Sequence, residues 1–560
     1  MKASESEFST PVWTILLCLA VSFAGIVDRD LWTPDEPRDA AIALEMSRTG
    51  AVIIPHLAGK PFVEKPPLYF AVAAGFAKAL GNVLGNTGAI RMSTAIWGVG
   101  TLLMTFLLAR RISGRPKAVL TAIILATMAG FIFNMHWVRV DAALVFSVSA
   151  ATWGFSEAYS GGRRWFCITG ALFTAAAFLS KGVIGPLLVF PASLGLIIPW
   201  LMNQRGKKFD LYIAQHLSAL VVFLVPVCAW MLMLRLRGGP TLWHEWFYEN
   251  HFGRLTGTAT GLSHMRAGYP FYYIEILLLY ALPWIPAIPL WLFRVIRDSA
   301  RTRSIPAPGE VFLAVWSIGS VLLLSVSVAK RDIYLAPVLP AFALICAEAL
   351  AAEVPKWIKY VFNFWTGLAV LILAGSFTSP LWSVFLPASV PDTVSSLLHT
   401  FAMRNVICGA GFFACIALIV RGQSMNVSAR LAAITAMLFI GFFAVAGKAI
   451  DAEKQLGEGT RAFAARIPAD KKPRIAGWNF CETSRAMFYY YCDWTVPLID
   501  DKNRLYDIVA GEDSEYDSVI VTREPSIPAL FGNKPYRVIT EEYIGAERHK
   551  RDLHWIEGTP

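Results

Sequence analysis

The sequence predicts an α-helical protein that crosses a membrane about thirteen times and ends in a small α/β domain. Of its 560 residues, 56% are hydrophobic and 16% are charged, and the mean hydropathy is +0.51, whereas about a quarter of the residues in a soluble domain are charged. Apolar runs long enough to cross about 30 Å of hydrocarbon recur up to about residue 449, and the rest of the chain lacks them. We therefore divide the chain into a transmembrane domain, 1–449, and a C-terminal domain, 450–560.

The predicted crossings are the longest apolar runs. They are 11–27, 91–109, 118–136, 141–159, 166–180, 183–202, 212–232, 271–293, 310–328, 335–351, 361–385, 401–420 and 431–449. The first run lacks the basic residues and cleavage site of a signal peptide, so we expect a retained helix. A further run, 66–84, contains Lys78 and several small residues, and we interpret it as a helix that lies along the membrane interface.

The positions of Lys and Arg support a non-spanning 66–84 segment. If 66–84 does not cross the membrane, clusters of Lys and Arg occupy the loops on one side of the membrane, around 110–117, 163–164, 205–208, 294–303, 356–359 and 421–430. The short loops of the other side hold only Arg139, Lys181, Lys330, Arg331 and Arg404. Because cytoplasmic loops are enriched in Lys and Arg, we place the N-terminus in the cytoplasm. The long loops 28–90 and 233–270 and the C-terminal domain then lie outside.

The net charge of +10 is explained by this orientation and does not indicate nucleic acid binding. In the C-terminal domain we predict helices near 453–467 and 482–491. Strands are predicted near 474–480, 518–522 and 536–540. Cys481 and Cys492 either form a disulfide, if this domain is outside the cytoplasm, or remain two buried thiols.

The first outside loop begins with acidic residues just beyond the first crossing. Asp35, Pro37 and Gly50 fit the start and the end of a helix, so Asp35 is either a helix cap or a functional carboxylate. Charged side chains this close to hydrocarbon are costly unless they are paired or line a wet cavity. That cost favours a functional role for Asp35 and its neighbours Glu36 and Asp39.

Later in the same loop, Glu64 and Lys65 precede Pro66 and Pro67, which fit a helix start. A helix N-terminus with a lysine beside it is suited to bind a phosphate, although a pair between Lys65 and Glu64 explains the same residues without a ligand. A carboxylate and a phosphate site in one loop are what transfer from a lipid-linked phosphate requires.

Other outside connections add polar residues in apolar surroundings, which is costly without a function. They are Arg139, Asp141, Lys181, Lys330, Arg331, Asp332 and Tyr334. In the loop 233–270 a membrane-interface belt explains the aromatic residues. Glu64 with His251 or His264 is a candidate site for a divalent metal ion, but the spacing matches no compact zinc pattern. The sequence therefore indicates no definite cofactor and leaves the need for a divalent metal ion open.

Several motifs carry a resemblance to one family of membrane glycosyltransferases. They are Asp35-Glu36-Pro37-Arg38 through Glu45-Met46, Pro55, Gly59, Glu64-Lys65-Pro66-Pro67-Leu68-Tyr69, Ser180-Lys181-Gly182 and the run from Lys330 to Pro337. They resemble motifs of the C superfold, in particular of the aminoarabinose transferases that modify lipid A and are related to protein O-mannosyltransferases. The resemblance implies a C-superfold transmembrane domain with a periplasmic α/β domain.

The same resemblance implies an enzyme of the bacterial inner membrane, linked to polymyxin resistance. It would move 4-amino-4-deoxy-L-arabinose from undecaprenyl phosphate to a phosphate of lipid A. Asp35 matches the family's catalytic carboxylate, and Lys65, Arg254 and Tyr334 match ligands of the donor phosphate. The further candidates for the substrate cavity are Glu36, Arg38, Glu64, Asp141, Lys181, Lys330 and Arg331.

The expected reaction is an attack on the anomeric carbon with inversion. Asp35 would orient or deprotonate the acceptor while cations hold the departing phosphate. One alternative is another sugar or acceptor, such as the lipopolysaccharide core or Ser and Thr of proteins. A second is a transporter of lipid-linked sugars, which predicts repeats and charges at mid-membrane, whereas the ionisable residues here gather at one face.

Overall fold

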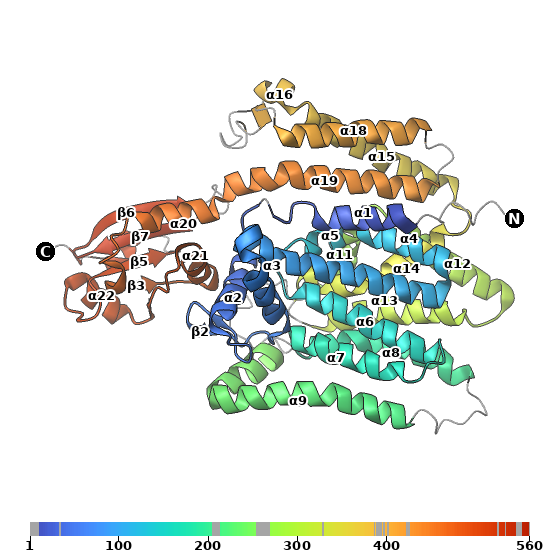
Figure 1. The fold of residues 1–560 in the computed structure, drawn as a ribbon, viewed down its shortest axis with the longest axis horizontal. Coiled ribbons are helices and arrows are strands. Elements are labelled where there is room, and N and C mark those ends of the chain that lie inside the picture. The colour runs from blue at the N-terminus through green and yellow to red at the C-terminus, as the bar shows by residue number, and fades with distance from the viewer. Residues whose placement is uncertain are drawn as a thin grey trace.

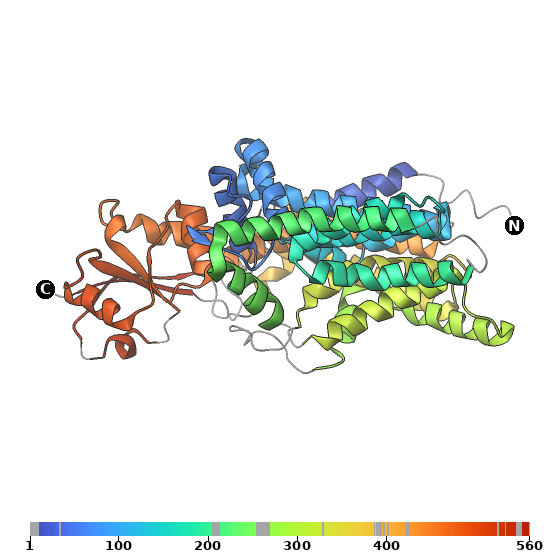
Figure 2. The same cartoon turned by 90° about the horizontal axis from the view of Figure 1, so that it is seen from below.

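The structure is a computed structural model. It describes residues 11–27, 29–32, 35–203, 213–253, 269–327, 330–385, 387, 395, 398–399, 402–421, 426–523, 526–532, 534–544 and 551–558. A bundle of long helices forms one part of the molecule, and a β-sheet with its own helices forms the other (Figure 1). Helix α2 (Glu36–Thr49) lies between the two parts, and Figure 2 shows the same division after a turn of 90°.

The bundle contains nearly all of the long apolar helices, because a helix satisfies its own backbone hydrogen bonds where water is absent. Its elements are α1 (Pro11–Phe23), α3 (Leu68–Ser113), α4 (Arg115–Ala126), α5 (Ala129–Met135), α6 (Asp141–Tyr159), α7 (Phe166–Lys181), α8 (Ile184–Asn203), α9 (Ile213–His244), the π-helix η2 (Glu245–Gly253), α11 (Tyr272–Tyr280), α12 (Ala287–Thr302), α13 (Pro308–Val326), the 3-10 helix η4 (Asp332–Val338), α14 (Leu339–Leu350), α15 (Lys356–Phe377), α16 (Ser379–Trp382), η5 (Ser383–Phe385), α18 (Met403–Arg421) and α19 (Val427–Lys454).

Every predicted crossing overlaps a helix, but the prediction of about thirteen crossings is not confirmed. By length and hydropathy, eight of the described helices could cross a membrane, or nine if α4 and α5, bent by 64°, form one broken span. The run 271–293 is divided between α11 and α12, because Pro283 and Pro286 lack the amide hydrogen that a continuous helix needs. The described chain is therefore a multi-span membrane protein with several broken or short helices.

The predicted helix 66–84 and the predicted crossing 91–109 are two pieces of α3. They meet at Gly85, whose φ of 68° and ψ of 158° are not helical. Glycine adopts such a positive φ without the steric cost that a Cβ would add. Tyr69 and Phe70 of the first piece are buried in the main hydrophobic core, so this piece packs against the first loop.

The C-terminal sheet region, residues 456–558, has five strands in the order β4-β3-β5-β7-β6. Strands β4 (Leu498–Ile499), β3 (Ile475–Trp478) and β5 (Ser518–Thr522) are parallel, whereas β7 (Arg551–Glu557) is antiparallel to both β5 and β6 (Arg537–Ile544). Helices α20 (Leu456–Ala465), α21 (Glu482–Cys492), α22 (Lys502–Ala510) and α23 (Ile527–Phe531) and the 3-10 helix η7 (Lys472–Arg474) complete it. Successive strand residues enter two separate cores, so helices cover both faces.

Helix α21 of this region bears on two earlier expectations. The predicted helix 482–491 is α21, and its ends are marked by Cys481 at the N-cap and Cys492 at the last turn. A helix of this length separates the two cysteines by about 16 Å, which is too far for a disulfide. Both are free thiols, so the disulfide alternative is wrong.

Helix α2 is held from two sides. Ala40, Ala41, Ile42 and Ala43 are fully buried, because α2 packs against α3 on one side and α21 on the other. As predicted, α2 begins with proline in its first turn and ends at Gly50, whose φ is 70°. The start of α2 is thereby fixed at the junction of the bundle and the C-terminal sheet region.

Candidate active site

A small polar cavity lies at this junction, where four connections of the bundle meet. It is lined by Asp35, Asp39, Glu64, Lys65, Arg139, Asp141, Lys181, Arg331 and Tyr334. Its volume is about 20 Å³, which is room for about one water molecule. The lining comprises four carboxylates, four cations and one phenol, so its formal charge is balanced.

Asp35 is the centre of the charge network. Its Oδ2 accepts a hydrogen bond of 2.8 Å from Nη2 of Arg331 and lies 3.2 Å from Nε of Arg139. Its Oδ1 lies 3.4 Å from Nη2 of Arg38. Among the described residues the carboxylate caps no amide of α2. Asp35 therefore occupies the predicted N-cap position of α2, but its oxygens face cations instead of the first amides of the helix.

The surrounding cations keep Asp35 ionised. Burial alone would favour the neutral acid, but the charges of Arg38, Arg139, Arg331 and Lys65 outweigh burial and hold the pKa of Asp35 well below its usual range. A carboxylate with such a low pKa is a poor proton acceptor. At neutral pH, Asp35 therefore offers a fixed negative charge and hydrogen-bond acceptors.

Lys65 is the most loosely paired of the buried cavity cations. Its Nζ lies 3.7 Å from Oδ1 of Asp39, and the residue is only 7% exposed. The other oxygen of Asp39, Oδ2, is buried and has no hydrogen-bond partner among the described residues. In contrast, Lys181 is in close contact with Asp141, and its Nζ lies 4.4 Å from the ring centre of Tyr334. Lys65 is thus best placed to turn toward an added anion.

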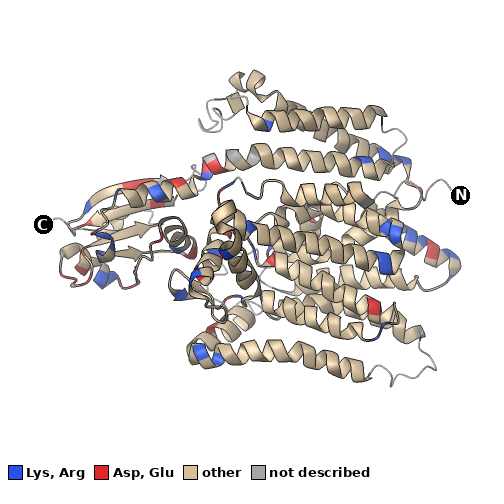
Figure 3. Cartoon of the chain, viewed as in Figure 1, with Lys and Arg blue, Asp and Glu red and all other residues tan. Residues whose placement is uncertain are grey.

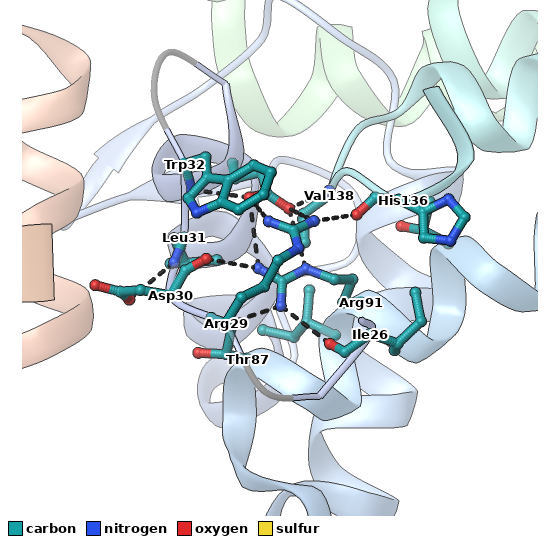
Figure 4. A network of polar contacts seen from close by, with 12 residues as sticks. Ile26, Arg29, Asp30, Leu31, Trp32, Thr87, Arg91, His136 and Val138 are labelled. Carbon is teal, nitrogen blue, oxygen red and sulfur yellow. Dashed lines mark hydrogen bonds and ion pairs between the residues drawn. The ribbon is translucent and has the colours of Figure 1, made fainter. Parts of the chain in front are cut away.

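Glu36, predicted to line the substrate cavity, lies instead in a separate buried network. Figure 4 shows its partners Arg29, Arg91 and Val138. Glu36 is fully buried and binds Arg29 at 2.8 Å and Arg91 at 3.1 Å. It also accepts hydrogen bonds from the amides of Trp32 and Val138. Burial opposes its ionisation, but the two arginines outweigh this and hold its pKa at about 2. Glu36 fastens the first loop to α3 and to the segment before α6.

Four other predicted site residues are not among the described residues that line the cavity. Arg38 contacts Asp35 and Asp39 from the rim, although it does not line the cavity. Lys330 turns to the carbonyl of Ser327, at 2.6 Å, and is also absent from the lining. Arg254 and His264 lie outside the described residues.

His251 packs directly beside the cavity through Gly182. A Cβ placed on Gly182 would lie 2.3 Å from Nε2 of His251, and Gly182 follows Lys181 in the chain. The Nδ1 of His251 lies 2.7 Å from the carbonyl of Trp246 in η2. This close approach joins the long loop 233–270 to the end of α7.

The described residues do not fit a divalent metal ion. Within the described ranges, no three His, Cys, Asp or Glu side chains group as metal ligands. The cavity carboxylates instead face cations: Asp35 faces Arg331, Asp39 faces Arg38, and Asp141 faces Lys181. Glu64 and His251 thus belong to no such group within the described ranges, and His264, the other predicted ligand, lies outside them.

Three residues of this region were not among the predicted catalytic, phosphate-binding or substrate-cavity residues, although Asp39 and Arg139 had been noted as costly charges. Asp39 and Arg139 line the cavity, and their signal was the same as for Asp35, a charge beside an apolar run. Glu482 of α21 binds Arg38 at 3.1 Å. It is 444 residues away in the chain, and no local pattern indicates that pair.

Replacing Gly182 by Ala is expected to disturb the candidate site and to lower the stability of the protein. The φ of +71° is unfavourable for any side chain and costs about 1–3 kcal/mol, and the new Cβ would displace His251. Gly114→Ala is the control, because Gly114 also has a positive φ but open space around it. We expect both variants to lose thermal stability, Gly182→Ala more than Gly114→Ala because of its clash with His251, and only Gly182→Ala to impair the activity of the cavity. Equal activity of the two variants would contradict a role for this contact.

Comparisons with known proteins agree with this architecture. The family described as dolichyl-phosphate-mannose-protein mannosyltransferase matches residues 64–230. The chain is 28% identical over 344 residues to an undecaprenyl phosphate-alpha-4-amino-4-deoxy-L-arabinose arabinosyl transferase of Edwardsiella ictaluri, covering 60% of this chain and 58% of the relative. It is 27% identical over 352 residues to a second such transferase, from Pseudomonas fluorescens, covering 60% of each. These matches span less than two thirds of the relatives' length.

The structural comparison covers more of the chain. The crystal structure of ArnT from Cupriavidus metallidurans bound to undecaprenyl phosphate matches with a TM-score of 0.72 and 20% identity, over 97% of both chains. The apo structure of the same protein matches with a TM-score of 0.71. At this identity the match shows a shared fold. Together the comparisons confirm the predicted resemblance to the aminoarabinose transferases and their mannosyltransferase relatives.

Proposed function

We propose that this protein is a glycosyltransferase that moves 4-amino-4-deoxy-L-arabinose from undecaprenyl phosphate to a phosphate of lipid A. The observation that carries the proposal is the cavity in which one buried, ionised carboxylate, Asp35, is surrounded by cations. Such a site combines a charge for the reacting sugar with charges for a departing phosphate. The relatives named for this reaction, and the fold shared with ArnT, supply the substrate class.

The donor phosphate would be held by Lys65, Arg331 and Tyr334. All three line the cavity, and Lys65 is loosely paired at 3.7 Å. Arg254 is included as a fourth ligand of the donor phosphate because its sequence motif matches that of the family. A sugar phosphate needs far more room than about 20 Å³. Its entry therefore separates ion pairs of the cavity, and the phosphate replaces carboxylates as the partner of the cations.

In the proposed reaction, the bond between the anomeric carbon and the donor phosphate oxygen breaks, and its electron pair leaves with undecaprenyl phosphate. An oxygen of the lipid A phosphate forms the new bond from the opposite face. This oxygen is already anionic, so it needs no base. Asp35 would stabilise the positive charge that develops on the sugar and accept a hydrogen bond from it. Its low pKa suits this role.

The proposed location is the inner membrane, with the N-terminus in the cytoplasm and the C-terminal sheet region and the cavity on the periplasmic side. Figure 3 shows Lys and Arg gathered at the bundle end remote from the C-terminal sheet region, near α4 and α12. Cytoplasmic loops carry such an excess. The thirteen-crossing arrangement remains part of this proposal.

The decisive experiment is expression of the chain in a Gram-negative host that lacks its own aminoarabinose transferase. We expect lipid A to gain the mass of aminoarabinose in mass spectrometry and the host to gain polymyxin resistance. No mass gain from a folded, membrane-inserted chain would contradict the proposal. A gain on the lipopolysaccharide core or on protein would instead support the alternative acceptors.

Replacing Lys65 by Ala is expected to weaken the binding of undecaprenyl phosphate by about 10- to 100-fold, the value of one charge-assisted contact. Lys60→Ala is the matched control, because Lys60 is an exposed lysine of the same loop, in β2 (Lys60–Pro61), which pairs with β1 (His56–Leu57). The measurement is the affinity of the purified protein for undecaprenyl phosphate. Equal affinities for the two variants would remove Lys65 from the donor site.

A further inference from the structure

Within the described residues, Glu482 connects the C-terminal sheet region to Arg38 beside the cavity. Glu482, the first residue of α21, places Oε2 3.1 Å from Nη1 of Arg38. The same guanidinium places Nε 3.0 Å from Oδ1 of Asp39 and Nη2 3.4 Å from Oδ1 of Asp35. Arg38 therefore connects the C-terminal sheet region with the candidate catalytic carboxylate.

The three distances show how Arg38 is restrained. Arginine and a carboxylate normally form contacts of about 2.7–2.9 Å, often with two nitrogens on two oxygens. Asp39 and Glu482 hold Nε and Nη1, so only Nη2 faces Asp35, at the longest of the three distances. Without Glu482, Nη1 would be free and Arg38 could rotate onto Asp35.

We propose that Glu482 is a positioning residue for transfer, which acts by holding Arg38 away from Asp35. The proposal rests on the proposed function of the cavity. A tighter pair with Arg38 would occupy the Asp35 oxygen that the sugar must reach and would neutralise the charge that stabilises the transition state. The charged or titratable groups that line the cavity with Asp35 from the other elements are Glu64, Lys65, Arg139, Asp141, Lys181, Arg331 and Tyr334.

The docking of α21 does not depend on Glu482. Arg485 donates a hydrogen bond of 2.5 Å to the carbonyl of Leu57. The hydroxyl of Tyr491 donates one of 2.5 Å to Asp30. The side chain of Glu482 is 46% exposed, and a pair with one such exposed partner adds little stability. The Glu482→Gln variant should therefore fold with α21 in place.

The test compares Glu482→Gln with Asp493→Asn in the full-length protein. Asp493 pairs with Arg48 at 2.5 Å on the same surface between α2 and α21 but does not contact Arg38. We expect Glu482→Gln to lower kcat about tenfold with the KM for the lipid-linked donor within about twofold, and Asp493→Asn to leave both unchanged. Glu482→Asp, which keeps the charge, should recover part of the loss.

Two results would overturn the proposal. One is a Glu482→Gln variant that behaves like Asp493→Asn. The other is an additional loss of kcat when Glu482→Gln is combined with Arg38→Ala, because a residue that acts through Arg38 has no effect without it.

A measurement without substrate separates this proposal from the proposed function. If the unaltered chain transfers no sugar, the proposed function fails, and the coupling between Arg38 and Glu482 is decided by thermal unfolding. Non-additive shifts in midpoint for Arg38→Ala and Glu482→Gln support the restraint on Arg38. Additive shifts overturn it.

Discussion

Replacing Asp35 by Asn is expected to lower transfer by about a thousandfold while the protein still binds undecaprenyl phosphate. The amide keeps the shape of the side chain but removes the charge that faces the reacting sugar. Arg139 and Arg331 then lose a carboxylate partner at 3.2 and 2.8 Å. Because these cations are freed for an added anion, affinity for undecaprenyl phosphate should be retained or increased.

The matched control is Asp332→Asn. Asp332 is the next residue after Arg331 but is absent from the cavity lining, and its carboxylate accepts a hydrogen bond of 3.0 Å from the hydroxyl of Tyr280. The two variants remove the same charge within one region. For both variants, transfer is measured by mass spectrometry of lipid A, and affinity for undecaprenyl phosphate by a lipid-binding measurement. Transfer by Asp35→Asn at the level of Asp332→Asn would exclude Asp35 from the chemistry.

Replacing Glu36 by Ala is expected to reduce the amount of folded protein, because it leaves Arg29 and Arg91 buried without their shared carboxylate. Loss of one partner from a buried charge network costs about 3–5 kcal/mol. Glu36 is fully buried, and two backbone amides also depend on it. The measurement is the yield and thermal midpoint of the detergent-purified protein.

Glu45→Ala is the comparison on the same helix. Glu45 is also buried, but the described contact of its carboxylate is a hydrogen bond of 3.1 Å from the amide of Gly59. We expect a smaller loss of stability, about 1–3 kcal/mol. If Glu36→Ala retained a normal midpoint and lost only transfer, Glu36 would belong to the reaction site and the structural interpretation would fail.

Much of the fold was predictable because membrane crossings are coded locally. A run of apolar residues must satisfy its backbone within one helix, so every predicted crossing overlaps a helix. The positions at which these helices break were harder to predict from the sequence. Gly85 divides α3, and α4 bends by 64° from α5, because neighbouring helices re-satisfy backbone groups that a break exposes.

The candidate site was predictable in part for the same physical reason. A charge beside an apolar run is costly, and that cost pointed to Asp35, Asp141, Lys181 and Arg331, whereas Lys65 was identified by the helix start beside it. The structure brings these five residues into one cavity. Their roles in transfer remain the proposal made above.

The sequence by itself determined which residues are too polar for their surroundings, but only the tertiary structure decided what satisfies each of them. Asp35 and Glu36 are adjacent and carry the same charge, yet one faces the cavity and the other is enclosed by Arg29 and Arg91. Arg38 finds Glu482 across 444 positions. Ion pairs depend on distances of a few ångströms, and such distances between remote segments arise only when the chain packs.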